Sequence, residues 1–398
     1  MHTSVLFAAS ETGGLRIGEA HLVPFLDVDT HYVFNPGRLN KNAISDMITV
    51  SRPGMRLSLE SESLKLNLSS EGEYQYYYGI EQAESKEFST FAGALNLSAD
   101  INRGSPLGIR VFNALVRSAQ PGNETATGRM LHTYNNLGLG ADYQPGGGAL
   151  QFSGDYVFFI DYYDRTTELG EKFNPAALDN LRHMPSFNLT WRFLPKTAAF
   201  IDAQGQFTDY YSNGAFYNSS TTNPNSTLFT SHMGLVGNLS TLVKVLLKAG
   251  YGASMIEGTK DNLSTAVGQL EIEYQLGAKD YLKVGFKRDI KPTALFKYYG
   301  LMRGYVEYRR SLNHRWNISA KLNYDDMRYG SALAGADNAR VDGSVMGNLG
   351  VTYQALAWLD VIVTESFESR TSNYVIEGSN DATGYFFNDF NITVRFKY

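Results

Sequence analysis

Apolar and polar side chains alternate, position by position, along most of this chain. In Asp389–Tyr398 apolar and aromatic side chains occupy every second position, and polar side chains occupy the positions between them. Arg315–Asp325 and Gln269–Leu276 repeat the pattern, as do Lys65–Tyr76 and Gln151–Ile160. Side chains of a β-strand point alternately to opposite faces of its sheet, so this period of two predicts strands with one apolar face.

The length of these segments distinguishes a membrane barrel from a soluble sandwich, which also alternates. They run for about 12–16 residues, whereas soluble strands usually span about 5–6 and a tilted membrane strand needs about 9–11 in lipid. No stretch approaches the ~18 apolar residues of a membrane-spanning helix, and Lys244 and Lys248 interrupt the most apolar one, Leu242–Ile256. The pattern therefore predicts an all-β protein, a single antiparallel up-and-down transmembrane β-barrel.

The predicted connections alternate between short and long. Eight are short turns, at Ser61–Ser63, Arg103–Pro106, Pro145–Gly148, Leu194–Lys196, Ser240–Thr241, Gly277–Lys279, Leu312–Asn313 and Ala355–Ala357. Nine are longer, at Asn35–Ser45, Gly79–Lys86, Gln120–Gly128, Asp164–Asp179, Tyr211–Asn225, Glu257–Asn262, Pro292–Leu295, Tyr329–Arg340 and Ser372–Ala382. These connections join about eighteen strands, so both termini and all short turns share one end of the barrel. Because outer-membrane barrels have short periplasmic turns, we expect that end to be periplasmic.

The alternation continues without a break in composition, which predicts one domain. We expect residues 1–20 to form a short periplasmic lead-in and residues 21–398 to form the barrel. The 26 Tyr and 23 Phe gather near predicted strand ends, as at Tyr74–Tyr78 and Tyr385–Phe387, and Phe396 and Tyr398 close the short-turn side. Amphipathic rings favour membrane interfaces, so we expect two aromatic girdles.

The face opposite the apolar stripe predicts the lining of the lumen. Eighteen strands enclose an aqueous space unless something fills it. We predict that the following side chains line a path for a polymer: Asp27, Asp29, His31, Arg56, Glu60, Lys65, Glu71, Glu73, Arg192, Asp202, Lys244, Lys248, Glu271, Glu273, Lys283, Lys287, Arg303, Tyr305, Glu307, Arg309, Lys321, Asp389 and Arg395. A lumen of one sign favours an ion-selective pore, whereas this mixed lining suits a hydrated, bulky polymer equally well.

Some lumen positions allow more specific interpretations. Tyr305 and Phe159 are predicted to point inward, where their rings either stack on sugars or fill volume and brace a loop. Asp27, Asp29 and His31 share one face and offer metal-ligand chemistry. However, same-face neighbours on a strand lie nearly 7 Å apart, which is poor for one ion. Ordinary lumen lining is therefore the favoured interpretation, and we expect no metal.

The sequence contains little that predicts an enzyme. Glu271 and Glu273 form a carboxylate pair, but a cross-strand charge ladder with Lys283 or Lys287 explains them better than acid/base catalysis. The chain has no nucleophile elbow and no nucleotide-binding loop. It has no Cys, which excludes thiol catalysis and Cys-based metal centres, and its net charge of −5 comes without a basic stripe for nucleic acid. We expect no cofactor.

The amino-terminal third resembles a known family. Leu15–Pro24 leads into the first long strand, and Asp46–Leu59 reads as an acidic second strand with a later Pro-Gly. Tyr74–Tyr78 ends a tyrosine-rich third strand, and Phe193–Thr197 resembles a turn of the same family. The chain departs from the family at Phe34–Gly37, where members often carry an Asp-Asn motif. These motifs resemble the second family of β-barrel porins, members of which are linked to bacterial exopolysaccharide systems.

The resemblance implies an integral outer-membrane porin that exports a secreted polysaccharide. Similar barrels act with a periplasmic polysaccharide-export protein, and the set most resembles those of myxobacteria. The terminal aromatic residue also resembles the signal that the barrel assembly machinery recognises, and the other implied partners are outer-membrane lipids and the polysaccharide chain. Three alternatives stay open: a general diffusion or small-solute porin, an outer-membrane enzyme acting on lipid or surface glycan, and an adhesive barrel whose loops do the work.

Overall fold

The computed structural model describes residues 14–38, 40–81, 88–121, 129–164, 175–211, 223–258, 262–277, 279–293, 297–330, 340–375 and 383–397. Strands dominate these ranges, together with short 3₁₀ helices such as η2 (Pro145–Gly147) and η3 (Pro175–Leu178). No helix within these ranges has the length and apolar character needed to cross a membrane.

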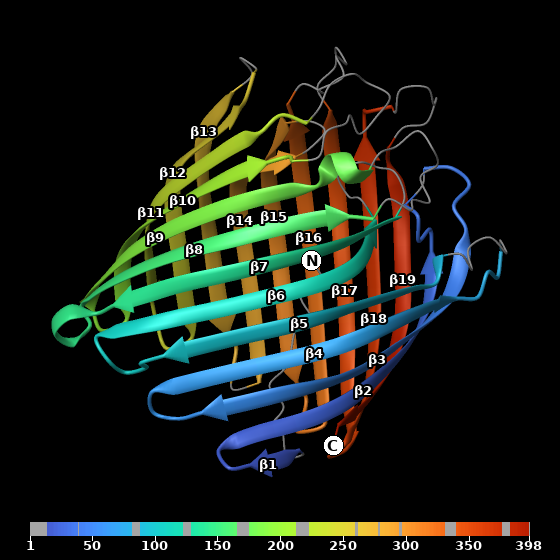
Figure 1. The fold of residues 1–398 in the computed structure, drawn as a ribbon, viewed down its shortest axis with the longest axis horizontal. Coiled ribbons are helices and arrows are strands. Elements are labelled where there is room, and N and C mark those ends of the chain that lie inside the picture. The colour runs from blue at the N-terminus through green and yellow to red at the C-terminus, as the bar shows by residue number, and fades with distance from the viewer. Residues whose placement is uncertain are drawn as a thin grey trace.

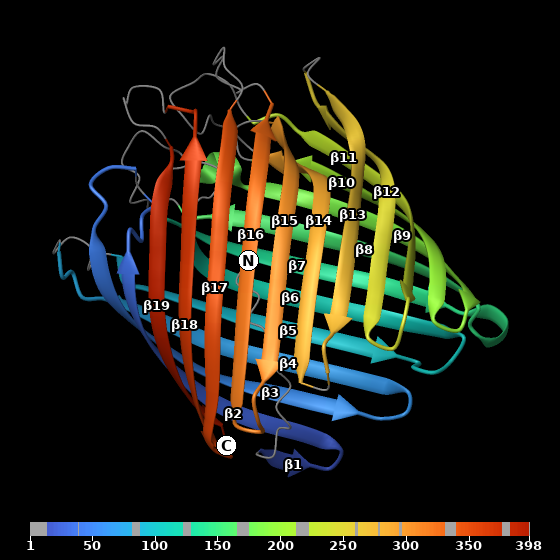
Figure 2. The same cartoon turned by 180° about the vertical axis from the view of Figure 1, so that it is seen from behind.

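Eighteen long antiparallel strands form one sheet that closes on itself, as Figures 1 and 2 show from opposite sides. Their bounds are β2 (Ala20–Phe34), β3 (Ser45–Glu60), β4 (Leu64–Tyr77), β5 (Thr90–Ile101), β6 (Leu107–Pro121), β7 (Arg129–Tyr143), β8 (Leu150–Tyr163), β9 (Asn180–Leu194), β10 (Thr197–Asp209), β11 (Ser226–Asn238), β12 (Val243–Ile256), β13 (Leu263–Gln275), β14 (Asp280–Thr293), β15 (Lys297–Ser311), β16 (Trp316–Tyr329), β17 (Val341–Leu356), β18 (Leu359–Ser372) and β19 (Tyr385–Lys397). A further strand of three residues, β1 (Leu15–Ile17), pairs with the start of β2.

Each long strand pairs with its neighbours in chain order, and β19 pairs with β2 to close the barrel. The closing register runs from Asn388 opposite Phe34 to Lys397 opposite Phe25. Closure leaves no long sheet edge for lipid to meet, which is what a sheet in a bilayer requires. The predicted all-β, eighteen-stranded up-and-down barrel is confirmed.

The connections alternate between a short-turn end and a long-loop end of the barrel (Figure 1), although one connection predicted to be long, between β14 and β15, spans only residues 294–296. The carboxyl terminus lies at the short-turn end. Two predicted short turns begin inside a strand. β9 continues to Leu194, and β17 continues to Leu356, so that only Ala357 and Trp358 separate β17 from β18. The register shifts between Gln354 and Leu356, and this irregularity carries the strand past the predicted turn.

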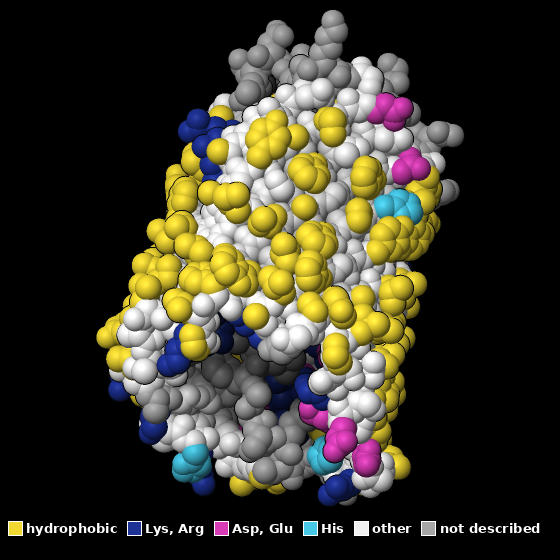
Figure 3. All heavy atoms as spheres, turned by 90° about the vertical axis from the view of Figure 1, so that its left-hand side faces the viewer, with side chains coloured by type: hydrophobic (Ala, Val, Ile, Leu, Met, Phe, Trp, Pro, Cys, Tyr) yellow, Lys and Arg dark blue, Asp and Glu magenta, His cyan; other side chains and the backbone are white. Residues whose placement is uncertain are grey.

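Exposed apolar side chains identify the outer surface. On β13 and β14 the opposed pairs Leu270–Phe286 and Ile272–Val284 are all exposed. Large apolar side chains with the same alternating exposure recur around the sheet. Figure 3 shows them as a broad apolar band on one side of the barrel. The outer face is therefore built to contact lipid.

Aromatic residues gather near both ends of the barrel, but consecutive ones divide between its two faces. Tyr74 and Tyr76 are exposed on the outer face of β4, whereas Tyr77 is 5% exposed. Strand geometry requires this division, because neighbouring side chains point to opposite faces. At the short-turn end Trp316 stacks on Tyr353, with ring centroids 4.4 Å apart. Tyr398 lies outside the described residues.

Two polar pairs interrupt the lipid-facing surface. Asn113 on β6 and Asn135 on β7 exchange side-chain hydrogen bonds of 3.2 and 3.3 Å. On β18 Glu365 stands opposite Phe390, which is an exposed residue of the apolar face, and its carboxylate accepts a hydrogen bond from Asn388. Each pair joins adjacent strands, so polar atoms in the apolar band obtain a partner within the protein.

The barrel wall is irregular where β13 meets β14. Within the described residues their register ends at Gly268 opposite Arg288, although β13 continues along β12 to Leu263 and β14 continues along β15 to Thr293. Figure 2 shows the two strands separating toward the long-loop end.

Beyond this point β14 lies on the lumen side of β12 and β13. Ile290 is completely buried, and a Cβ atom added to the inward-facing Gly252 would lie 3.0 Å from both Ile290 and Val267. Arg288 donates a hydrogen bond of 2.7 Å to Thr265 of β13. Because residue 252 is a glycine, Ile290 can approach the backbone of β12 closely.

Candidate functional site

The register of the sheet determines which side chains face the lumen. Residues opposite one another on adjacent strands share a face, so the exposed Phe390 and Ile392 place Asp389 on the inner face. The same reasoning around the sheet places the predicted side chains at lumen-facing positions: Asp27, Asp29, His31, Arg56, Glu60, Lys65, Glu71, Glu73, Arg192, Asp202, Lys244, Lys248, Glu271, Glu273, Lys283, Lys287, Arg303, Tyr305, Glu307, Arg309, Lys321, Asp389 and Arg395. That a polymer follows this lining is part of the proposed function.

Figure 3 shows the molecule hollowed at its short-turn end, with basic and acidic side chains beside the hollow. These charged side chains contrast with the apolar band above them. The lumen is consequently a charged, hydrated surface inside an apolar wall.

The acidic row on β2 is divided among separate partners. Arg395 donates to Asp27 at 2.7–3.1 Å across the closing seam, and Arg52 pairs with Asp29. His31 lies 2.9 Å from Asp389. Each group therefore binds an amino-acid partner on a neighbouring strand, and the described residues contain no cluster that could hold a metal ion.

A charge ladder crosses β12, β13 and β14 near the short-turn end. Lys283 lies 3.5 Å from Glu271 and 3.6 Å from Glu273, and Lys244 lies 3.5 Å from Glu273. The predicted partner Lys287 instead pairs with Asp289 at 2.8 Å. The two glutamates thus serve a cross-strand ladder, with cations beside both carboxylates.

Within the described residues, Lys65, Lys248 and Lys321 face the lumen without such a partner. Among the described residues, no carboxylate oxygen lies within ion-pair distance of Lys248 or Lys321. Lys321 is exposed and Lys248 is partly exposed, on β16 and β12. These ammonium groups remain available to solutes in the lumen.

The two aromatic residues predicted to face the lumen adopt different arrangements. The Phe159 ring stacks on Tyr134 with centroids 5.3 Å apart, and the guanidinium carbon of Arg182 lies 3.6 Å from its centroid. Both neighbours brace Phe159, which matches the volume-filling interpretation. The Tyr305 ring lies across Gly285, where its hydroxyl donates to Glu271 and accepts from Gln269.

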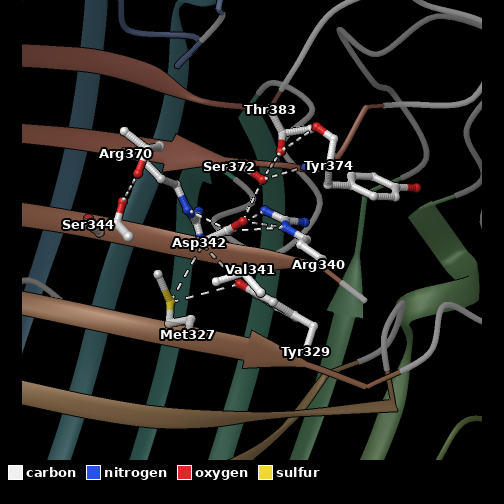
Figure 4. Close-up of polar contacts among 12 residues, drawn as sticks. Met327, Tyr329, Arg340, Val341, Asp342, Ser344, Arg370, Ser372, Tyr374 and Thr383 are labelled. Atoms are coloured by element: carbon white, nitrogen blue, oxygen red, sulfur yellow. Dashed lines mark hydrogen bonds and ion pairs between the residues drawn. The ribbon is translucent and has the colours of Figure 1, made fainter. Parts of the chain in front are cut away.

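A buried ionic cluster at the long-loop end was not predicted from the sequence (Figure 4). Asp342 accepts hydrogen bonds of 2.7–3.0 Å from Arg340 and lies 3.0 Å from Arg370. The side chains of Arg340 and Asp342 are fully buried, and that of Arg370 is 3% exposed. Charges in such a site need close partners, and this cluster joins the start of β17 to the end of β18.

Aromatic rings complete this cluster. The guanidinium carbon of Arg340 lies 4.6 Å from the Tyr329 centroid and 5.4 Å from that of Tyr374. The Tyr329 hydroxyl accepts a 3.0 Å hydrogen bond from Arg370. Spacing could have revealed part of the cluster, because Arg340 and Asp342 lie two positions apart and therefore on one face.

Tyr211 lies just beyond β10, at the same end of the barrel. Burial raises the pKa of its phenol, and the neighbouring Asp179 and Asp161 raise it further. The hydroxyl therefore stays protonated and can donate to the Asp161 carbonyl oxygen, 3.5 Å away.

Sequence reasoning also missed two histidine–aspartate pairs in the lumen. His132 on β7 lies 2.9 Å from Asp161 on β8, and His232 on β11 lies 2.7 Å from Asp202 on β10. Asp202 was predicted to face the lumen, but its partner is 30 residues away in the chain. Only the strand register brings the two together.

Comparison with protein families identifies one match. The model of the family described as "Putative beta-barrel porin 2" matches residues 8–394, nearly the whole chain. A search of curated proteins finds no match.

Several solved structures are similar to this chain at low sequence identity. The apoprotein form of the FrpB iron transporter from Neisseria meningitidis (F5-1 variant) is 9% identical, with 97% of this chain and 82% of that chain covered and a TM-score of 0.52. OccK3 (OpdO) of Pseudomonas aeruginosa is 12% identical, with 95% of each chain covered and a TM-score of 0.48. OccAB3 of Acinetobacter baumannii is 11% identical, with 95% and 99% covered and a TM-score of 0.49. At these identities the FrpB likeness shows the fold alone.

Proposed function

The chain belongs to the Putative beta-barrel porin 2 family, and from this premise we propose that it carries a secreted polysaccharide across the outer membrane. As a porin of this family with a closed barrel, it is an integral outer-membrane protein and acts in transport rather than catalysis. The nature of its solute is our proposal, as is the periplasmic position of its short-turn end.

The observation that carries the proposal is the charge pattern of the lumen. Its carboxylates and cations are interleaved and largely paired across strands, as in the ladder of Glu271, Glu273 and Lys283. Paired charges present many hydrogen-bonding groups but little net field, so a solute is not selected by its charge. A polysaccharide is a hydrated chain of hydroxyl groups, and such a wall can exchange hydrogen bonds with it along the whole path.

The similarity of the amino-terminal strands to exopolysaccharide-linked porins supports the same solute. It also supports the partners we propose: a periplasmic polysaccharide-export protein that delivers the chain to the short-turn end, and the barrel assembly machinery that inserts the porin among outer-membrane lipids. The protein itself would supply passive guidance, since its described residues show no site for coupled chemistry.

Deleting the gene in its native host tests the proposal. We expect surface polysaccharide, measured with a carbohydrate-binding dye, to fall, and polymer to accumulate in the periplasm. Reintroducing the intact gene should restore the surface polymer. Normal surface polymer together with an empty periplasm would refute the proposal.

A general diffusion porin is the main alternative, because the fold serves it equally well. Uptake of small labelled sugars into the same deletion strain separates the two. Loss of small-solute uptake with unchanged surface polymer would favour the diffusion porin.

A further inference from the structure

Four aromatic side chains lie flat on the lumen wall, each across a glycine of the next strand. In each case a Cβ atom added to the glycine would overlap the ring. The pairs are Phe25 with Gly54, Phe112 with Gly138, Phe200 with Gly234, and Tyr305 with Gly285.

This geometry turns one face of each ring to the wall and the other toward the lumen. Phe159, by contrast, is flanked by the Tyr134 ring and the Arg182 guanidinium. A ring can lie down only where the neighbouring position has no side chain, and glycine provides that.

Three of the four rings have no stacking partner among the described residues. The guanidinium carbon of Arg56 lies 4.6 Å from the Phe25 centroid and covers that ring, which is only 8% exposed. Within the described part of the chain, neither an aromatic ring nor a guanidinium group stacks on Phe112, Phe200 or Tyr305. All three are partly exposed.

These three rings lie within six residues of the short-turn ends of their strands and on different sides of the lumen. Phe112 lies five residues from the short-turn end of β6, Phe200 lies three from that of β10, and Tyr305 lies six from that of β15. The strands β6, β10 and β15 are well separated around the closed sheet. Together the rings form a lumen belt near the short-turn end.

Polar groups accompany each ring of the belt. The Tyr305 hydroxyl is held by Glu271 and Gln269. Arg110, two positions from Phe112 on the same face, pairs with Asp155 at 2.7 Å. Lys248 stands opposite Gly234, the glycine that Phe200 covers.

We propose that Phe112, Phe200 and Tyr305 are stacking platforms for pyranose rings of the translocating chain. The inference rests on the proposed function and names the contacts that a polysaccharide makes on entering the lumen. The C–H faces of a pyranose are apolar and pack on an aromatic face, while its hydroxyl groups point sideways to hydrogen-bonding neighbours. Separate platforms allow one sugar unit to leave as another binds, so the chain is held weakly at several points.

The competing explanation is that the rings only stabilise glycine-containing strands. The protein supplies a matched control for it. Phe367 on β18 lies across Gly347 of β17 in the same way, but Leu349, Ile392 and the other exposed apolar neighbours place this pair on the lipid face. If the rings only stabilise the strands, replacing Phe367 should affect the channel in the same way as replacing a lumen-facing ring.

Single-channel recording in planar bilayers tests the proposal with cellohexaose as the probe and polyethylene glycol of similar length as a polymer without sugar rings. We expect Tyr305→Leu or Phe112→Leu to shorten the time for which cellohexaose blocks the current by about three- to tenfold per ring. Tyr305→Phe and Phe112→Tyr keep the ring and should keep the blocking time. Polyethylene glycol blockades should not change.

The control variant Phe367→Leu should leave both probes unaffected. The proposal is overturned if Tyr305→Leu and Phe112→Leu leave cellohexaose blockades unchanged, or if Phe367→Leu shortens them equally. The leucine variants could fail to assemble, in which case Phe112→Tyr provides the test. A cellohexaose blocking time equal to that of the wild type supports the proposal. A shorter blocking time in this ring-bearing variant overturns it. If the polymer keeps its normal location in the deletion strain, the proposed export function is refuted. The bilayer recordings would still test sugar binding separately.

Discussion

At the scale of single residues, Asp342 shows how strongly this barrel depends on paired charges. The arginines at 340 and 370 share its carboxylate, and all three side chains are at most 3% exposed. We expect Asp342→Asn to cost about 3–5 kcal/mol of unfolding free energy, because it leaves two buried cations without their common anion. Urea unfolding in lipid vesicles measures this change.

Asp326 and Arg328 form the matched exposed pair. They also lie two positions apart, at 3.1 Å, but the Arg328 side chain is 70% exposed. Asp326→Asn should cost no more than about 1 kcal/mol, since water screens the pair. Equal losses for the two aspartate variants would contradict the assigned role of burial.

Individual residue positions were predictable to different degrees. The side a residue faces follows from the period of two, and this places Asp27 and Glu271 in the lumen without further information. The partner of that side chain cannot be predicted from the same period, because it depends on the register between neighbouring strands. Lys283 rather than Lys287 bridges the two glutamates, since the pairing places Glu273 opposite Lys283 and Gln269 opposite Lys287.

At the scale of strands, the asparagine pair between β6 and β7 tests how the sheet tolerates polar groups in lipid. Asn113→Leu should cost about 1–3 kcal/mol by leaving Asn135 without its side-chain partner. The double variant Asn113→Leu/Asn135→Leu should recover most of this loss, because both polar groups are then gone. A double-mutant cycle of unfolding free energies in vesicles measures the coupling, and additive losses would show that the pair is not coupled.

The overlap of β13 and β14 gives a second test at this scale. The chain has no Cys, so engineered pairs can be oxidised without competition. Leu270→Cys/Phe286→Cys joins residues in register and should form a disulfide. Ala266→Cys/Ile290→Cys would lie opposite only if that register continued, so it should stay reduced.

Mobility on non-reducing denaturing gels after oxidation, compared with the same sample after reduction, distinguishes the two results. Rapid cross-linking of the 266/290 pair would mean that β14 pairs with β13 up to the long-loop end. It would contradict the placement of Ile290 beneath Gly252.

Sequence patterns predicted the strands well, but they did not indicate that β14 overlaps β12 and β13. Strand number and the alternation of turns follow from local periodicity and connection length. The displacement of β14 depends on packing between residues that are distant in the chain, with Gly252 making room for Ile290. No local pattern marks such a glycine as different from one in a turn.

At the scale of the whole molecule, the balance of lumen charge predicts weak ion selectivity. The lysines at 248 and 321 contribute cations without described carboxylate partners. Lys248→Glu/Lys321→Glu should therefore shift the reversal potential in a KCl gradient toward cation selectivity. Arg328→Glu on the outer face should shift it much less, and equal shifts would contradict the assignment of the lysines to the lumen.

The proposed function requires that a polysaccharide passes through the lumen. The most direct measurement is the ionic current through single reconstituted barrels while the exopolysaccharide of the native host is added at the short-turn end. We expect transient blockades whose duration increases with chain length and falls when the polymer is enzymatically shortened. Currents that the polymer leaves uninterrupted, or blockades independent of chain length, would contradict it.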